Sequence, residues 1–191
     1  MRIMAIAGIM VAAMTGTITA HARTLDTRLD PKVVVCMGMG AGLARTMVVK
    51  AMTSEMFEKI GVIIIWHGAP CPADGIRITL KLDTPSALKP EALAFAILDR
   101  GMHIVVFYDR VLTLSEDSTV SVLLAHVLTH EITHVLQGVA RHSDTGLMKA
   151  RWSAKDIKSM AGRYMEFSEQ DVVLIYRGLA SRSNTLTPAT H

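Results

Sequence analysis

The chain is predicted to fold as α/β (α+β), with a mostly parallel, twisted sheet of about five strands. Short apolar runs rich in valine and isoleucine predict strands that are covered on both faces, as in parallel sheets. Two longer segments with apolar residues at helical spacing predict helices that pack on this sheet. Half of the 191 residues are apolar, which suits one domain with a sizeable core. Two shorter helical patterns after these elements predict a small C-terminal helical part.

The strands are predicted from runs of apolar residues that are bounded by turn residues. Residues 76–82 alternate between apolar and polar side chains, which is typical of a strand with one exposed face. Residues 93–98 fit either a strand or a helix, and as a strand they would form an edge hairpin through a turn at 99–101. The predicted strands are 32–36, 62–66, 76–82, 93–98 and 103–108.

The helices are predicted from spacing and from their end residues. Residues 41–60 carry an apolar stripe at every fourth position, and Gly61 ends this helix. Ser115 followed by two acidic residues predicts the start of a long helix that reaches Gln137. Its apolar stripe would face the core, and its histidines would lie on a different face. Shorter helices are predicted to begin at Ser153 and at Ser168, the latter ending near Ala180.

The N-terminal 22 residues have the pattern of a secretory signal peptide. A basic residue precedes an uncharged stretch at 3–20, and Ala20-His21-Ala22 fits a small-residue cleavage site. Cleavage before Arg23 would give a secreted or periplasmic protein without stable membrane insertion. An uncleaved membrane anchor is the alternative, because this stretch could just span a bilayer.

The rest of the chain divides into a flexible polar segment (23–31), the domain (32–180) and a tail (181–191). Loss of Arg2 with the signal peptide would leave a net charge of +2, which argues against a nucleic-acid partner. Cys36 and Cys71 are the only cysteines, and an even number in an exported protein favours a disulfide over two free thiols. Cys36 ends one predicted strand and Cys71 follows another, so parallel pairing of these strands would bring the two cysteines to the same end of the sheet.

The run His130-Glu131-Ile132-Thr133-His134 predicts a zinc site on the long helix. Histidines four residues apart lie one turn apart on one helix face, so both imidazoles can bind one zinc ion. Glu131 is then placed to act on a zinc-bound water. His142 follows Gly138, a residue that lets the chain turn back and supply a third ligand. Three protein ligands leave one position for water, which is the catalytic pattern.

This pattern, with Ser143 after His142 and then Met148, resembles the metzincin zinc peptidases, and His142-Ser143 is similar to their matrixin branch. The resemblance covers about 32–152 and looks closest to small secreted bacterial proteins. It implies a metzincin-like fold with an active-site helix. It also implies a methionine turn beneath the metal at Met148. The family usually has its glycine three residues, and its third histidine six residues, after the second histidine. Here these distances are four and eight, so the loop must bulge.

The resemblance implies roles for four residues of the motif. His130, His134 and His142 would bind zinc, and Glu131 would be the general base in peptide hydrolysis.

Two further residues compete as metal ligands. His126 lies one turn before His130, but it is two turns, about 12 Å, from His134, so the three helix histidines are not expected to share one ion. We expect His126 to be a supporting or buried residue. Glu166 follows His134 by 32 residues and is the alternative third ligand, as in the other large HExxH group. We favour His142 over Glu166.

The sequence therefore predicts a secreted zinc metalloendopeptidase that acts on peptides or proteins, with zinc as cofactor. The alternative is a non-catalytic, zinc-stabilised exported binding domain. The intact glutamate argues against this alternative, because a purely structural zinc site does not need Glu131.

Overall fold

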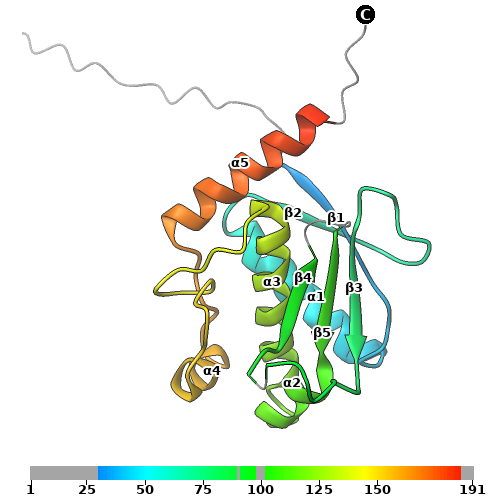
Figure 1. The fold of residues 1–191 in the computed structure, drawn as a ribbon, viewed down its shortest axis with the longest axis vertical. Helices are drawn as coiled ribbons and strands as arrows, with labels where there is room; N and C mark the ends of the chain where they lie inside the picture. The colour runs from blue at the N-terminus through cyan, green and yellow to red at the C-terminus, as the bar shows by residue number, and fades with distance from the viewer. Residues whose placement is uncertain (1–29, 90, 98–101, 186–191) are drawn as a thin grey trace, which may run out of the picture.

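The computed structural model describes residues 30–89, 91–97 and 102–185. It confirms a mixed α/β fold around a five-stranded, mostly parallel sheet (Figure 1). The signal peptide and most of the segment 23–31 lie outside the described residues. The elements are β1 (Lys32–Met37), α1 (Leu43–Glu58), β2 (Ile63–His67), β3 (Ile76–Lys81), β4 (Ala94–Ile97), β5 (His103–Phe107), α2 (Tyr108–Leu114), α3 (Val120–Gln137), α4 (Ala154–Met160) and α5 (Glu169–Thr185).

The sheet has the strand order β2-β1-β3-β5-β4. The first four strands of this order run parallel, with Val34 opposite Ile65 and Ile78 opposite Ile104. The last strand, β4, pairs antiparallel with β5. Residues 93–98 were predicted to be either a strand or a helix, and they contain a strand. This strand lies at an edge of the sheet, as the strand interpretation predicted.

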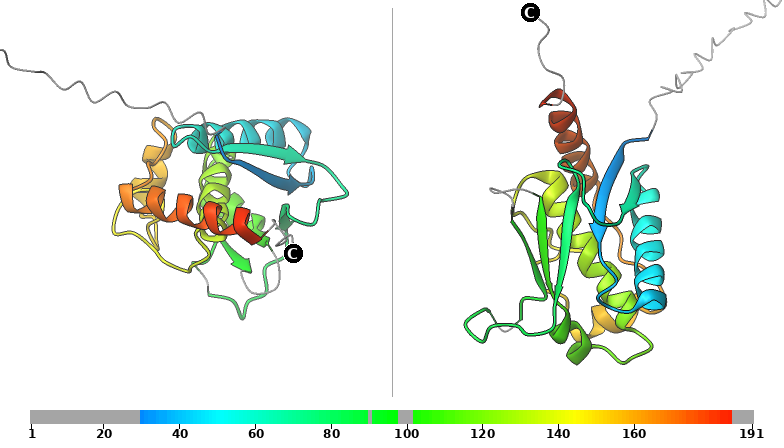
Figure 2. Two further views of the ribbon diagram at one scale, coloured as in Figure 1. Left: turned by 90° about the horizontal axis from the view of Figure 1, so that it is seen from above. Right: turned by 90° about the vertical axis from the view of Figure 1, so that its right-hand side faces the viewer.

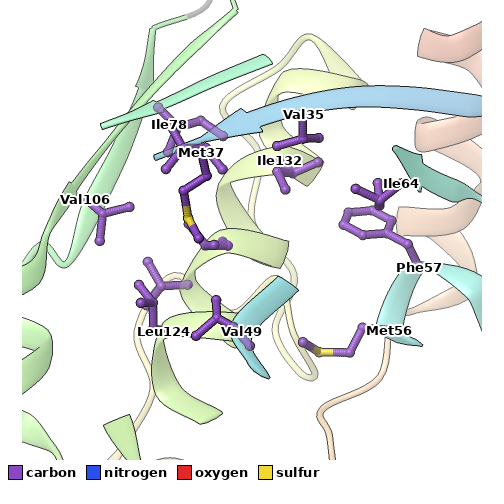
Figure 3. Close-up of a cluster of buried hydrophobic side chains, with 14 of the residues drawn as sticks. Val35, Met37, Val49, Met56, Phe57, Ile64, Ile78, Val106, Leu124 and Ile132 are labelled. Carbon is purple, nitrogen blue, oxygen red and sulfur yellow. The ribbon is translucent and has the colours of Figure 1, made fainter. Parts of the chain in front are cut away.

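Helices α1 and α3 cover one face of the sheet (Figure 2). Ile65 of β2 is exposed, so the prediction of strands covered on both faces is wrong for this strand. Helix α1 packs against β2, and α3 packs against α1, β4 and β5. Alternate strand residues such as Val35 and Ile78 meet Val49 and Leu124 from these helices in one buried cluster (Figure 3). On its other sides α3 contacts α4 and α5, so it lies at the centre of the domain.

Helix α3 differs from its prediction at the N-terminal end. It begins at Val120, with Thr119 as N-cap, and residues 108–114 form a separate helix α2 that was not predicted. Ser115 is not the N-cap of α3. It is the C-cap of α2, and its hydroxyl donates to the Val111 carbonyl of that helix. The surroundings of α3 also differ, because every residue from Leu123 to Gln137 is buried. The histidine face is therefore covered, and not only the apolar stripe.

The helix ends that glycine or a capping box predicts are confirmed in most places. Gly138 is the left-handed C-cap of α3. Gly61 is also left-handed, but α1 is shorter than predicted, because it runs from Leu43 to Glu58 and its C-cap is Lys59. Ser153 forms a capping box with Asp156 at the start of α4. Helix α5 runs to Thr185, so residues 181–185 of the expected tail are helical.

Cys36 and Cys71 form a disulfide, with their Cα atoms 5.8 Å apart. The parallel pairing of β1 with β2 brings the two residues together, as expected. Among the described residues, the structure contains no helix that is long and apolar enough to cross a membrane.

Helices α3 and α5 approach each other so closely at Gly178 that a side chain is excluded there. A Cβ atom at this position would lie 1.8 Å from the Leu136 carbonyl oxygen. We predict that Gly178→Ala lowers the free energy of unfolding by about 1–3 kcal/mol, despite the higher helix propensity of alanine. Urea unfolding measures this change. Gly162→Ala is the control, because the nearest atom to its Cβ would lie at 3.9 Å. Equal stability of the two variants would contradict the close approach.

Candidate metal centre

Three histidines from two segments meet at one side of α3. His130 and His134 lie one turn apart on the helix, and His142 lies in the loop that follows. One nitrogen from each ring lies within 4.8 Å of the corresponding nitrogens of the other two. His130 and His134 are buried, whereas His142 is exposed. The cluster is therefore open to solvent on the side of His142.

Gly138 starts the loop that brings His142 back to the helix. Its φ of 68° is left-handed, and its N–H donates to the His134 carbonyl, so α3 ends there. The loop is closed by the Ser143 N–H, which donates to the Met148 carbonyl at 2.8 Å. Met148 is fully buried in the core. The wider spacing of this chain thus still places His142 beside the two helix histidines.

Backbone carbonyls fix the orientation of both helix histidines. The Nδ1 atom of His130 is 3.0 Å from the Leu147 oxygen, and that of His134 is 3.2 Å from the Val139 oxygen. Because a carbonyl oxygen can only accept, both Nδ1 atoms carry the proton and donate it. Each Nε2 atom of the neutral rings then presents a lone pair.

The two Nε2 atoms face each other at 3.0 Å. Neither neutral ring can donate across this contact, since the proton of each is already on Nδ1. Two lone pairs at this distance repel unless a cation lies between them. Nitrogen atoms bound tetrahedrally to one zinc ion at about 2.0–2.1 Å lie roughly 3.3 Å apart, so the pair fits a shared zinc ion.

The protonation of the cluster also suits a metal. Burial lowers the pKa of His130 to about 4 and lowers the pKa values of His134 and His142 as well. All three rings are therefore neutral near pH 7 and offer a lone pair. Three imidazoles are a donor set of catalytic zinc sites.

Glu131 is a buried carboxyl group beside the cluster. It is only 8% exposed, and it makes no hydrogen bond or ion pair with any described residue. Burial raises its pKa to about 7. A buried carboxylate without a partner destabilises a fold, and such groups mark candidate functional sites. A pKa near 7 suits a group that takes up and releases a proton in a reaction.

His126 is a structural residue, in agreement with the expectation. Its ring is fully buried, and its Nδ1–H donates to the Val122 carbonyl at 2.7 Å. Its Nε2 atom accepts the N–H of Met165 at 3.2 Å. Both nitrogens are used, so neither is free for a metal.

The structure does not bring Glu166 to the histidine cluster. Its side chain is exposed, and its carboxylate pairs with Arg163. Its backbone oxygen accepts the N–H of Leu147, the residue whose carbonyl holds His130. Glu166 therefore supports the site through its main chain.

Two residues near the site were missed from the sequence. The Trp152 ring lies edge-on to His130, with ring centroids 5.5 Å apart. Asp171 is fully buried and bonds to residues on both sides of His142. The spacing of Asp171 from Ser168 indicates a helix cap, but no pattern in the sequence indicates its link to a loop about 30 residues earlier.

Comparison with known proteins supports the fold assignment. No family model matches the chain, and no curated protein matches it. Among solved structures, the fold is similar to that of archaemetzincin from Methanopyrus kandleri, with a TM-score of 0.53 and 16% sequence identity. The likeness covers 82% of this chain and 99% of that one. At this identity the comparison shows a shared fold.

Removal of each candidate third ligand is predicted to affect metal binding differently. His142→Ala takes a nitrogen from the cluster, so we expect the zinc affinity to fall by at least about tenfold. Glu166→Ala leaves the backbone bond to Leu147 in place, so we expect unchanged affinity. Competition with a chromogenic chelator measures both. Loss of zinc binding in Glu166→Ala alone would contradict the geometry.

The metal-free protein is predicted to lose stability, relative to Glu131→Gln, as the pH rises. The folded state keeps the Glu131 proton up to a pKa of about 7, whereas an unperturbed carboxyl group releases it near 4.5. Between these values the folded state binds more protons, so rising pH favours unfolding of the parent. Urea unfolding in a chelator, below pH 4.5 and above pH 7, measures this difference. A constant stability difference between parent and variant would show that Glu131 is not buried alone.

Proposed function

We propose that this protein is a secreted or periplasmic zinc metallopeptidase. His130, His134 and His142 would hold the zinc ion, and Glu131 would be the general base for hydrolysis of peptide bonds. The observation that carries the proposal is the approach of two Nε2 lone pairs at 3.0 Å, with His142 beside them. This arrangement favours a bound cation and leaves a side open for water.

The fold gives independent support. The sequence motif resembles that of the metzincins, and the chain shares its fold with a protein named archaemetzincin. Motif and fold were recognised from different properties of the chain, namely residue spacing and strand topology. Their agreement favours a metzincin-like peptidase over an accidental HExxH match.

The reaction would divide between the metal and Glu131. A zinc ion held by the three histidines would supply Lewis-acid chemistry. Glu131 takes the proton of the attacking water and passes it to the leaving amine. A carboxyl group whose pKa lies near 7 in the metal-free protein can do both. A nearby cation would lower this pKa and favour the basic form.

The substrate would be a peptide or protein in extended form. Strand β4 is the edge of the sheet and packs against α3, the helix that carries His130 and His134. One side of β4 pairs with β5, and its other side has no strand partner among the described residues. An extended peptide can add to such an edge through main-chain hydrogen bonds. β4 would therefore offer an edge along which an extended substrate could align.

Export is supported by two features of the chain. The N-terminal residues have the pattern of a signal peptide, as described above. The Cys36–Cys71 disulfide is typical of proteins in oxidising compartments. A non-catalytic zinc domain would share both features, and Glu131 distinguishes the two functions because only a catalyst uses it.

Glu131→Gln is predicted to remove peptidase activity while zinc stays bound. The amide cannot accept the water proton, so we expect kcat to fall by about 10²–10⁴-fold. The assay is cleavage of a quenched fluorescent peptide library, with zinc content measured on the same samples. Glu58→Gln makes the same chemical change at an exposed position and is the control. Equal cleavage by Glu131→Gln and the parent would refute the proposed mechanism, and inactivity of a zinc-loaded parent would favour a binding domain.

A further inference from the structure

The loop that carries His142 is attached to helix α5 through one buried carboxylate. The Oδ1 atom of Asp171 accepts the Arg141 Nη1–H at 2.8 Å and the Ser143 hydroxyl at 2.7 Å. These donors are the two residues that flank His142. Asp171 is fully buried, so solvent does not compete for these bonds.

The second carboxylate oxygen and the backbone oxygen of Asp171 also accept hydrogen bonds. Its Oδ2 atom accepts the backbone N–H and the hydroxyl of Ser168, at 3.0 and 2.6 Å, in the capping box of α5. Its backbone oxygen accepts the side-chain amide of Gln137, the last residue of α3, at 3.2 Å. Asp171 thus joins the end of α3, the start of α5 and the His142 loop.

His142 itself has no such bond. Backbone carbonyls orient His130 and His134, but neither ring nitrogen of His142 makes a hydrogen bond with a described residue. Its ring lies against the other two imidazoles, with ring centroids 5.3 and 4.9 Å away. The direction in which His142 points must therefore come from the backbone on either side of it.

We infer that Asp171 is the positioning residue for His142, holding the third ligand in place through Arg141 and Ser143. This inference rests on the proposed zinc site. Groups that orient metal ligands in this way typically change metal affinity by 10–100-fold when they are replaced. A free loop would first have to be ordered on zinc binding, which lowers the affinity.

An asparagine cannot replace the carboxylate. Each oxygen of Asp171 accepts two donors, and the NH₂ group of an amide accepts none. Asp171→Asn therefore loses either the bonds to the loop or the cap of α5. Asp156 has the same place in the capping box of α4, bonded to Ser153, and no bond to Arg141 or Ser143 is among its contacts. All of its bonds, including an ion pair with Lys149 at 2.6 Å, use the Oδ2 atom, which the amide oxygen of asparagine can replace. Asp156→Asn is therefore the control for the same chemical change at a capping aspartate that does not bond to the residues beside His142.

The test measures zinc affinity by chelator competition on the full-length purified protein. We expect Asp171→Asn to weaken binding by about 10–100-fold, and Asp156→Asn to leave it unchanged. In a His142→Ala background, Asp171→Asn should cause no further loss, because its effect passes through His142. Ser143→Ala removes one donor on the loop side and leaves the cap intact. It should weaken binding in the same direction, and it provides the test if Asp171→Asn does not fold.

A spectroscopic readout separates positioning from general stability. With Co²⁺ in place of zinc, the visible absorption of Asp171→Asn should shift towards that of His142→Ala, while Asp156→Asn keeps the parent spectrum. Parent-like affinity and spectrum in both Asp171→Asn and Ser143→Ala would overturn this inference and leave the proposed function standing. A parent protein that binds neither metal would overturn both.

Discussion

The site depends on two hydrogen bonds that fix the tautomer and orientation of His130 and His134. The carbonyls of Leu147 and Val139 each take the Nδ1–H of a helix histidine and so direct both Nε2 lone pairs at one point. The 3.0 Å approach of these atoms is unfavourable without a cation. Both nitrogens of His126 are hydrogen-bonded to the backbone, so this ring needs no cation to balance a free lone pair. Bonding partners, and not helix position, therefore separate the candidate ligands from their neighbour.

The rest of the domain keeps those two carbonyls in place. Leu147 is held through its N–H by the Glu166 carbonyl, and Val139 follows the glycine that ends α3. Gly146 has a positive φ, and a Cβ there would lie 2.5 Å from the Glu166 oxygen, so the two segments are in direct contact. Helix α5 then fixes the far side of the loop through Asp171. A helix that is buried on all sides allows this, because every segment around the histidines packs on one rigid support.

Much of this arrangement could be predicted from the sequence, because it follows from local spacing. Four-residue spacing places His130 beside His134 on any helix, and Gly138 marks the place where the chain leaves it. The alternation in β3 and the apolar runs in β1 and β2 likewise depend on near neighbours. Ser115 misled the prediction because a capping hydroxyl and a hydroxyl that bonds back to the preceding helix look alike in sequence. Asp171 was missed because its partners in the loop are distant along the chain, and Glu166 was considered for its carboxylate although its main chain makes the contact with the site.

The central claim is that three imidazoles hold one zinc ion and leave a position for water. X-ray absorption at the zinc edge of the loaded, purified protein tests it most directly. The account predicts one zinc per chain, with three histidine nitrogens and one further light atom at about 2.0–2.1 Å. A site with four protein ligands, a sulfur ligand or no stoichiometric zinc would contradict it.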